Sequence, residues 1–247
     1  MRHSALAFET GIATHVGRVR EANEDALFAG PDLGVWLVAD GMGGHEKGEL
    51  ASATIVEEVS GIGEAASPAD QLARFRDAVG RANAELLRAA RRLGPNASIG
   101  STVAAVLIHG THYACAWSGD SRIYLVRGGH IRQLSRDHRH VQDLVDSGAI
   151  TPAEARVSPQ RSLITRAVGI MDDPKPEVIE GDIESGDSFV VCSDGLTDPV
   201  EDAEILQHVE AHPPQSACDA LVDLALERGA PDNVTVVVVR CPAGEAG

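Results

Sequence analysis

Apolar residues of this chain gather in short runs, and most runs have the length of a β-strand. They predict strands at residues 35–39, 102–108, 113–117, 123–126, 178–183, 189–192 and 234–239, with a further strand at Ile131. The continuous apolar character of the runs 178–183, 189–192 and 234–239 indicates strands that are covered on both faces. Short connections at 109–111, 118–121 and 128–129 join consecutive strands. A parallel crossover needs a dozen residues or more, so we expect antiparallel neighbours rather than a doubly wound parallel sheet.

Three other stretches repeat apolar residues at mostly three- and four-residue spacing, which marks one face of a helix. The stripes are Leu72, Phe75, Val79, Leu86 and Ala90 within 70–93; Ala51, Ile55 and Val59; and Ala217, Ala220, Leu221, Leu224 and Ala225 after Pro213-Pro214. Antiparallel sheets together with helices that have one apolar face predict two packed sheets with helices outside them, an α+β fold.

The segment 135–169 differs from the rest of the chain. It is polar and rich in arginine, with helix-like pieces at 137–147 and from Thr151-Pro152 onwards. We expect an insertion over one end of the sandwich, a flap that could serve as a lid. Because no linker or repeat divides the chain, residues 1–247 are interpreted as one domain. The tail at 242–247 is expected to be frayed.

Composition excludes several classes of protein. The net charge of −16 argues against nucleic acid and anionic membranes as partners. No stretch approaches the length of a membrane span, and the first residues lack the apolar core of a secretory signal. The cysteines Cys115, Cys192, Cys218 and Cys241 form no CxxC pair and are expected to be buried in a reducing compartment. We therefore expect a cytoplasmic protein.

Six acidic residues stand in short segments beside apolar runs. They are Glu24, Asp25, Asp40, Asp120, Asp194 and Asp232. Carboxylates at strand ends are the ligands that hard divalent cations prefer. Asp40-Gly41 and Asp194-Gly195 both follow strand-like runs, and the glycine at 41 would let its carbonyl approach the same ion. Asp-Gly is also an ordinary turn signal, but two such pairs joined by further acids favour a metal site.

Electrostatics supports this interpretation. Two carboxylates about 4 Å apart repel each other by roughly 4 kcal/mol at an effective dielectric near 20. A cluster of them would have raised pKa values unless cations neutralised it. No His and Cys residues have zinc spacing and no EF-hand pattern occurs, so Mg²⁺ or Mn²⁺ is the expected ion.

Arg20 lies four residues before Glu24. If this stretch is extended, the two side chains share a face, and the guanidinium could hold a phosphate group beside the metals. The alternative is a plain ion pair with Glu21 or Glu24.

Seven ordered motifs carry a family resemblance. They are Arg20-x-x-Asn23-Glu24-Asp25, Val38-Ala39-Asp40-Gly41-Met42-Gly43-Gly44, Ser101-Thr102, Ser118-Gly119-Asp120-Ser121-Arg122, Ile164-Thr165-Arg166-Ala167-Val168-Gly169, Ser193-Asp194-Gly195-Leu196-Thr197-Asp198 and Asp232-Asn233-Val234-Thr235. This order resembles the PPM (type 2C) family of metal-dependent serine/threonine protein phosphatases in its compact bacterial form. The resemblance covers roughly residues 10 to 240, and one motif alone would be weak.

The resemblance implies an αββα sandwich with two or three Mn²⁺ or Mg²⁺ ions at one end. Asp40 would bridge two metals; Asp194 and Asp232 would complete one of them, and Glu24 and the Gly41 carbonyl would serve the other. Asp25 would hold metal-bound water. Asp120, with Asp194 or Asp198, would form the third-metal site of bacterial members. Arg20 matches the phosphate-binding arginine, and 135–169 matches the flap.

The implied activity is hydrolysis of phosphoserine and phosphothreonine in proteins by a metal-activated water, without a phosphoenzyme. Asp40, Asp194 and Arg20 would be the catalytic residues, and phosphorylated kinases and their substrates the partners of a monomeric enzyme. Met42 is a departure, because animal relatives carry a histidine there that is proposed as the general acid. His45 and His138 are nearby in sequence or in the flap, and neither is assigned a catalytic role.

Two alternatives stay open at this stage. One is a hydrolase with a nucleophilic aspartate and a single Mg²⁺, for which Asp194-x-x-x-Asp198 could be the acidic motif. That chemistry usually needs a second acid two residues after the nucleophile, whereas Asp40 is followed by Gly41 and Met42. The other is a non-catalytic module of the same fold that binds phosphoproteins and regulates a partner. Such modules usually lack metal ligands, and this chain retains the expected carboxylates.

Overall fold

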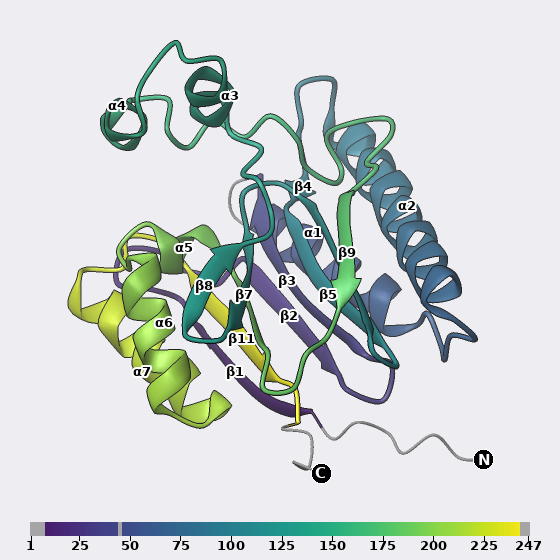
Figure 1. Cartoon of the computed structure of the whole chain (residues 1–247). Helices are drawn as coiled ribbons and strands as arrows, with labels where there is room; N and C mark the ends of the chain where they lie inside the picture. The colour runs from purple at the N-terminus through teal and green to yellow at the C-terminus, as the bar shows by residue number, and fades with distance from the viewer. Residues whose placement is uncertain (1–7, 44–45, 243–247) are drawn as a thin grey trace.

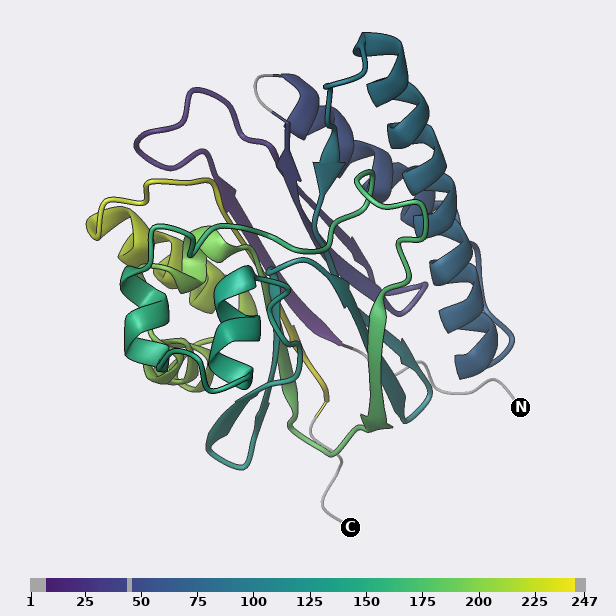
Figure 2. The same ribbon diagram turned by 90° about the horizontal axis from the view of Figure 1, so that it is seen from above.

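The computed structural model describes residues 8–43 and 46–242, which fold into two antiparallel sheets packed face to face (Figures 1 and 2). The first sheet has the strand order β1-β11-β10-β7-β8: Glu9–His15, Val234–Arg240, Ser188–Cys192, Arg122–Arg127 and His130–Gln133. The second has the order β2-β3-β5-β6-β9, with β4 paired to β3: Asp25–Gly30, Val35–Met42, Val103–His109, His112–Ser118, Glu177–Asp182 and Gly100–Ser101. Every strand pairing is antiparallel.

Helices cover the outer faces of both sheets, as the view from above shows (Figure 2). The second sheet is covered by α1 (Glu46–Ser60) and α2 (Pro68–Leu93). The first sheet is covered by α5 (Asp194–Thr197), α6 (Asp202–Ala211) and α7 (Pro214–Glu227). The layer order is helix, sheet, sheet, helix, which confirms the predicted αββα sandwich.

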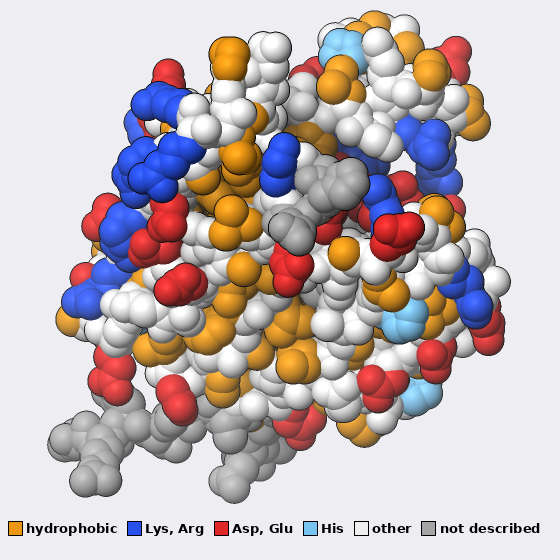
Figure 3. All heavy atoms as spheres, turned by 180° about the vertical axis from the view of Figure 1, so that it is seen from behind, with side chains coloured by type: hydrophobic (Ala, Val, Ile, Leu, Met, Phe, Trp, Pro, Cys, Tyr) orange, Lys and Arg blue, Asp and Glu red, His pale blue; other side chains and the backbone are white. Residues whose placement is uncertain are grey.

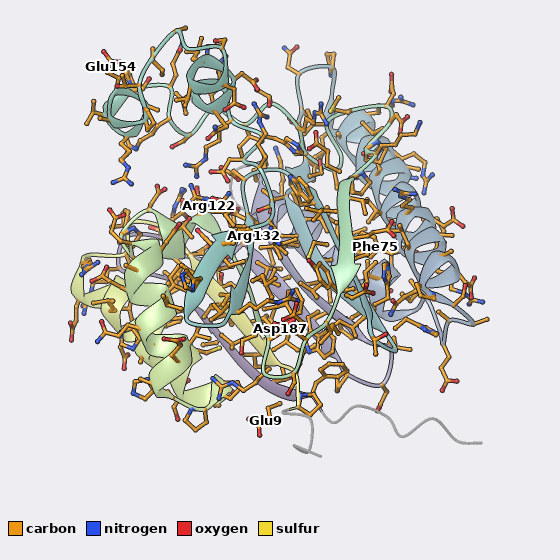
Figure 4. All side chains as sticks on the ribbon, viewed as in Figure 1. Glu9, Phe75, Arg122, Arg132, Glu154 and Asp187 are labelled. Atoms are coloured by element: carbon orange, nitrogen blue, oxygen red, sulfur yellow. The ribbon has the colours of Figure 1, made fainter. Side chains whose placement is uncertain are left out.

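The core has three layers because each central strand is apolar on both faces. In β3, Leu37 packs towards α1 and α2 while Trp36 packs between the two sheets. In β11, Val237 faces the inter-sheet layer and Val236 faces the helices of the first sheet. Phe75 of α2 lies against the second sheet and is fully buried (Figure 4). The contacts of β11 confirm that the apolar run 234–239 is covered on both faces.

Local sequence signals place the ends of several elements. Ser67 caps α2 by accepting a hydrogen bond of 3.1 Å from the backbone N–H of Asp70. The turn Gly128-Gly129 joins β7 and β8, and both glycines have positive φ angles of 56° and 76°. The three predicted helices correspond to α1, α2 and α7. All four cysteines are free and buried, as expected.

Two expectations about strands are wrong. The connection 118–121 does not join neighbours, because β6 belongs to the second sheet and β7 to the first. A short loop suits either a hairpin or a step from one sheet to the next, and here it makes the step and carries Asp120. The run at 178–183 forms β9, an edge strand whose Ile179 is 36% exposed, so both faces are not covered.

The flap lies at one end of the sandwich, above α5 in Figure 1. Within 135–169 it contains α3 (His140–Asp146) and α4 (Pro152–Val157), and Thr151 and Glu154 form a capping box at the start of α4. Of the predicted frayed tail at 242–247, residues 243–247 lie outside the described residues, as does the histidine at position 45. Among the described helices, none combines the length and apolar character that crossing a membrane requires.

Candidate metal centre

The acidic residues predicted from the sequence converge at the flap end of the sandwich. Asp25 begins β2 and stands directly opposite Asp40 of β3 in the strand register. Asp194 begins α5 just after β10, and Asp232 precedes β11, the antiparallel neighbour of β10. Ser193 links the two sheets here, because its Oγ donates a hydrogen bond of 2.8 Å to Asp25 Oδ2. The antiparallel topology therefore gathers carboxylates that are far apart in sequence.

Glu24 and Gly41 face a common point. The N–H of Gly41 donates a 3.1 Å hydrogen bond to the carbonyl of Glu24, which also accepts a 2.6 Å bond from Ser52 Oγ. A methyl group built on Gly48 would lie 2.6 Å from Glu24 Oε1 and 2.9 Å from the Gly41 carbonyl oxygen. Only glycine at 48 therefore leaves this cradle of oxygens open. That the Glu24 carboxylate and the Gly41 carbonyl serve the same ion stays a prediction.

Thr102 fixes the strand end that carries Asp40. Its hydroxyl accepts a 3.0 Å hydrogen bond from the Asp40 N–H and lies 2.7 Å from the hydroxyl of Ser121. Its own N–H donates a 2.8 Å bond to the Asp40 carbonyl. Thr102 is fully buried. Thr102 thus hydrogen-bonds both the N–H and the carbonyl of Asp40. The motif Ser101-Thr102 contains this residue, but its spacing along the chain did not indicate this role.

Arg20 reaches the edge of the centre through Asp232. Its Nη2 donates a 2.7 Å bond to Asp232 Oδ2, and 52% of the Arg20 side chain is exposed. The segment before Glu24 is a loop of turns and bends, so the condition under which Arg20 and Glu24 would share a face, an extended stretch, is not met. The ion pair that Arg20 forms with Asp232 differs from the pair with Glu21 or Glu24 that was the alternative to phosphate binding. Hydrogen bonding to Asp232 raises the pKa of Arg20 above its ordinary value.

Asn233 holds this loop against the first sheet. Its amide donates to the carbonyls of Val16 and Ala22 at 2.8 and 2.9 Å, and its Oδ1 accepts from the N–H of Glu24 at 2.8 Å. Asn233 is 5% exposed. The buried amide of Asn233 consequently helps to position the loop that bears Arg20 and Glu24.

A second group of carboxylates surrounds Arg139 of the flap. The Nε of Arg139 lies 2.5 Å from Asp120 Oδ2, its Nη2 lies 2.7 Å from Asp194 Oδ2, and its Nη1 lies 3.5 Å from Asp198 Oδ1. Asp120 is 1% exposed and Arg139 8%. Spacing along the chain gave no sign of this contact, because the arginine approaches from an insertion.

Burial and mutual repulsion shift the pKa values of these acids upward. Burial, followed by the charges of Asp25 and Asp194, raises the pKa of Asp40 well above its ordinary range. Burial and then Asp120 do the same to the pKa of Asp194, with Arg139 opposing. Burial raises the pKa of Asp25 to about 6, although hydrogen bonds with Thr235 and Ser193 lower it. Such a cluster gains stability when positive charge is placed within it.

The donor set around Asp40 fits a hard divalent cation. It consists of carboxylate oxygens and one backbone carbonyl, without a sulfur or imidazole ligand. Among the described residues, no group of three or more side chains of His, Cys, Asp or Glu lies close enough together to hold a metal ion without other ligands. Mg²⁺ keeps several waters and binds through one or two carboxylates, so an open arrangement suits it.

Comparison with known proteins decides the family. A profile described as "Protein phosphatase 2C" matches residues 13–234. The chain belongs to the protein phosphatase 2C family. This confirms the family resemblance that the seven motifs indicated.

Relatives within the protein phosphatase 2C family have names that agree with the predicted enzyme class. "Serine/threonine protein phosphatase PstP" of Mycobacterium tuberculosis is 40% identical over 96% of this chain and 46% of its own length. "Protein phosphatase PhpP" of Streptococcus pneumoniae is 32% identical over 94% of this chain and 96% of its own. The chain therefore spans about half the length of the PstP sequence that it matches.

A solved structure extends the comparison to metals. The catalytic domain of PstP in complex with two manganese ions aligns with a TM-score of 0.86 and 35% identity, covering 96% of this chain and 99% of the other. The fold is thus that of the protein phosphatase 2C family. Metal dependence is a property of this family, and the donor set described above agrees with it.

Proposed function

We propose that this chain hydrolyses phosphoserine and phosphothreonine esters of proteins with divalent cations bound at the Asp40 centre, and without a phosphoenzyme. The observation that carries the proposal is the convergence of Asp25, Asp40, Asp194 and Asp232 at one end of the sandwich, in a chain of the protein phosphatase 2C family. The alternative of a non-catalytic regulator has no support from the comparisons, since the named relatives are phosphatases.

The proposed metal ligands form two sets, one for each of two cations. Asp40 would be shared between two cations, Mn²⁺ or Mg²⁺. Asp194 and Asp232 would complete one, and Glu24 with the Gly41 carbonyl would hold the other. When bound, the cations would supply Lewis acidity that lowers the pKa of water towards neutrality and neutralises phosphoryl oxygens. The raised pKa of Asp40 supports this role, because the folded chain places its carboxylate where charge is unfavourable without a counter-ion.

Arg20 would bind the phosphoryl group of the substrate. Its guanidinium is more than half exposed at the edge of the centre, and its Nη2 contacts Asp232 Oδ2. A guanidinium offers five N–H donors in one plane, so it can keep this contact and still donate to two phosphate oxygens. Arg20 thus orients the substrate against the carboxylates and neutralises charge that develops during attack.

Asp25 would orient the attacking water. Its Oδ2 accepts a 2.8 Å hydrogen bond from Ser193, whose Oγ accepts in turn from the Thr235 N–H at 3.0 Å. This chain of hydrogen bonds fixes the direction of the carboxylate. Burial raises the pKa of Asp25, and nearby bound cations would favour its ionised form, which can accept a hydrogen bond from water.

The leaving alkoxide has no proton donor among the obvious candidates of the described residues. Met42 cannot donate a proton. His138 is 1% exposed, and its Nδ1 accepts a 3.0 Å hydrogen bond from the Gly119 N–H. Burial also lowers the pKa of His138. His138 therefore has a structural role, and the proposed source of the proton is solvent.

The proposed partners are phosphorylated proteins, including serine/threonine kinases and their substrates. The molecule is strongly acidic, although arginines gather along the edge that α2 forms (Figure 3). Four buried free cysteines support the proposed location in a reducing cytoplasm. The proposed state is a monomer.

The proposal is tested with a panel of phosphoserine, phosphothreonine and phosphotyrosine peptides, assayed with EDTA and after addition of excess Mn²⁺. We expect phosphate release from the first two only when Mn²⁺ is present, and none from the Asp40→Asn variant. Release that survives EDTA would contradict a metal-dependent reaction. Failure to release phosphate from any peptide under saturating Mn²⁺ would favour the non-catalytic alternative.

A further inference from the structure

Arg139 lies where the flap joins the body of the molecule. Its backbone forms an isolated antiparallel bridge with Ile164, so the outgoing and returning ends of the flap meet at this point. The preceding His138 donates its N–H to the Gly119 carbonyl at 2.9 Å. The base of the flap is therefore hydrogen-bonded to the loop that carries Asp120. The side chain of Arg139 extends from this base into the acidic centre.

The guanidinium of Arg139 contacts three carboxylates with its three nitrogens. The distances are 2.5 Å to Asp120, 2.7 Å to Asp194 and 3.5 Å to Asp198. Side-chain exposure is 9% for Arg139, 1% for Asp120, 17% for Asp194 and 41% for Asp198. A guanidinium stays protonated under all ordinary conditions, and its fork of donors matches carboxylates. This buried positive charge is part of the fold, unlike an ion that exchanges with solvent.

The position of this guanidinium disagrees with the expected third-metal site. Asp120 with Asp194 or Asp198 was the predicted ligand set, and one oxygen of each now contacts Arg139. A cation at the same place would meet the guanidinium at short range. Within the described part of the chain, the buried Oδ1 of Asp120 has no hydrogen-bond partner. This oxygen and the second oxygens of Asp194 and Asp198 are still fewer than the six or more ligands that a hard cation takes.

We propose that Arg139 takes the place of a third divalent cation in this chain, as a permanent positive charge between Asp120, Asp194 and Asp198. The inference rests on the proposed function, since it assumes that the Asp40 side of the centre binds cations. Arg139 is then a positioning residue. It engages Asp194 Oδ2 and directs this carboxylate, while it fastens the base of the flap to the centre.

The inference is tested first on the wild-type chain by crystallography with Mn²⁺ and anomalous scattering. We expect two Mn²⁺ peaks beside Asp40 and guanidinium density between Asp120, Asp194 and Asp198. A third peak among those three carboxylates, with Arg139 displaced, would overturn the inference while leaving the proposed function intact. A crystal without Mn²⁺ peaks would instead contradict the proposed function.

Equilibrium dialysis then gives the number of Mn²⁺ ions bound per chain for the wild type and for variants. Arg139→Ala should bind one Mn²⁺ more than the wild-type chain at millimolar Mn²⁺, because three carboxylates lose their internal cation. Arg139→Lys should keep the wild-type count, since it retains the charge. Arg136→Ala is the matched control: it removes a flap arginine that pairs with Asp143 and Asp146 and should not change the count.

Equal counts in folded wild-type and Arg139→Ala chains would overturn the inference. Circular dichroism and thermal melting establish whether the alanine variant folds. If it does not, the wild-type crystal and Arg139→Lys still decide the question, because a third ion in either one contradicts a site filled by the internal cation.

Discussion

Replacing Asp40 with Asn should change the stability of the chain in opposite directions with and without divalent cations. Asp40 stands opposite Asp25 in the β2–β3 register, and burial followed by the charge of Asp25 raises its pKa. Opposed side chains in an antiparallel pair have Cβ atoms about 5 Å apart. At an effective dielectric near 20, two unit charges at about 5 Å repel by about 3 kcal/mol. Asn has nearly the same shape and removes this repulsion.

The size of the effect on melting follows from the length of the chain. For a domain of 150–250 residues, each kcal/mol shifts Tm by about 2–4 °C, so Asp40→Asn should raise Tm by about 6–12 °C in EDTA at pH 7.5. Because a raised pKa in the folded state costs stability only above the unfolded pKa of about 4, the gain should disappear near pH 4. In saturating Mn²⁺ the order should reverse, since only the wild-type chain gains the free energy of metal binding.

Differential scanning calorimetry in the two buffers provides the measurement. Asp187→Asn is the control, because Asp187 is 1% exposed and its Oδ2 forms a 2.6 Å ion pair with Arg127. That substitution should lower Tm in both buffers. If Asp40→Asn lowers Tm in EDTA as Asp187→Asn does, the carboxylates do not repel one another and the electrostatic account of the centre is wrong.

Three further predictions concern binding, local structure and pH. Arg20→Ala should chiefly raise KM for a small phosphate ester in steady-state kinetics, because the guanidinium holds phosphate in ground and transition states alike. Arg18→Ala is the control. An unchanged KM in Arg20→Ala would exclude phosphate binding by Arg20. Thr102→Val should lower the free energy of unfolding, measured in urea, by about 1–3 kcal/mol, because the Asp40 N–H loses its acceptor. Thr102→Ser keeps the hydroxyl and should have a stability near that of the wild type. Equal losses in both variants would show that the Thr102 hydroxyl does not stabilise the chain. Mn²⁺ affinity measured by calorimetry should fall below about pH 6, where protons compete for Asp25; an affinity independent of pH between 5 and 8 would contradict this.

The central strands could be predicted from the sequence because they are apolar on both faces. The runs that became β3, β5, β10 and β11 are almost wholly buried. By contrast, β1 and β2 gave no usable signal, since most of their residues are partly or fully exposed. Helix α6 was also missed, because Ile205 and Val209 are its only buried residues. The strength of the hydrophobic pattern along the sequence therefore decided which strands and helices could be predicted.

The candidate site could be predicted in part from residue type. The Asp-Gly pairs after apolar runs single out Asp40 and Asp194, and the two carboxylates lie in one buried cluster, while their binding of metal stays a prediction. The ion pair between Arg20 and Asp232 depends on a loop that Asn233 holds, and no spacing rule encodes it. The contacts of Arg139 could not be predicted either, because a long side chain from an insertion can reach several places, and only the folded chain shows which one it reaches.

The central claim is that buried carboxylates around Asp40 bind paired divalent cations. Titration of the chain with Mn²⁺, followed by electron paramagnetic resonance of the free ion, tests it most directly. The account predicts two bound Mn²⁺ per wild-type chain and loss of both in Asp40→Asn, because the two ions share this ligand. An Asp40→Asn chain that binds Mn²⁺ in the same number and with the same affinity as the wild type would contradict it.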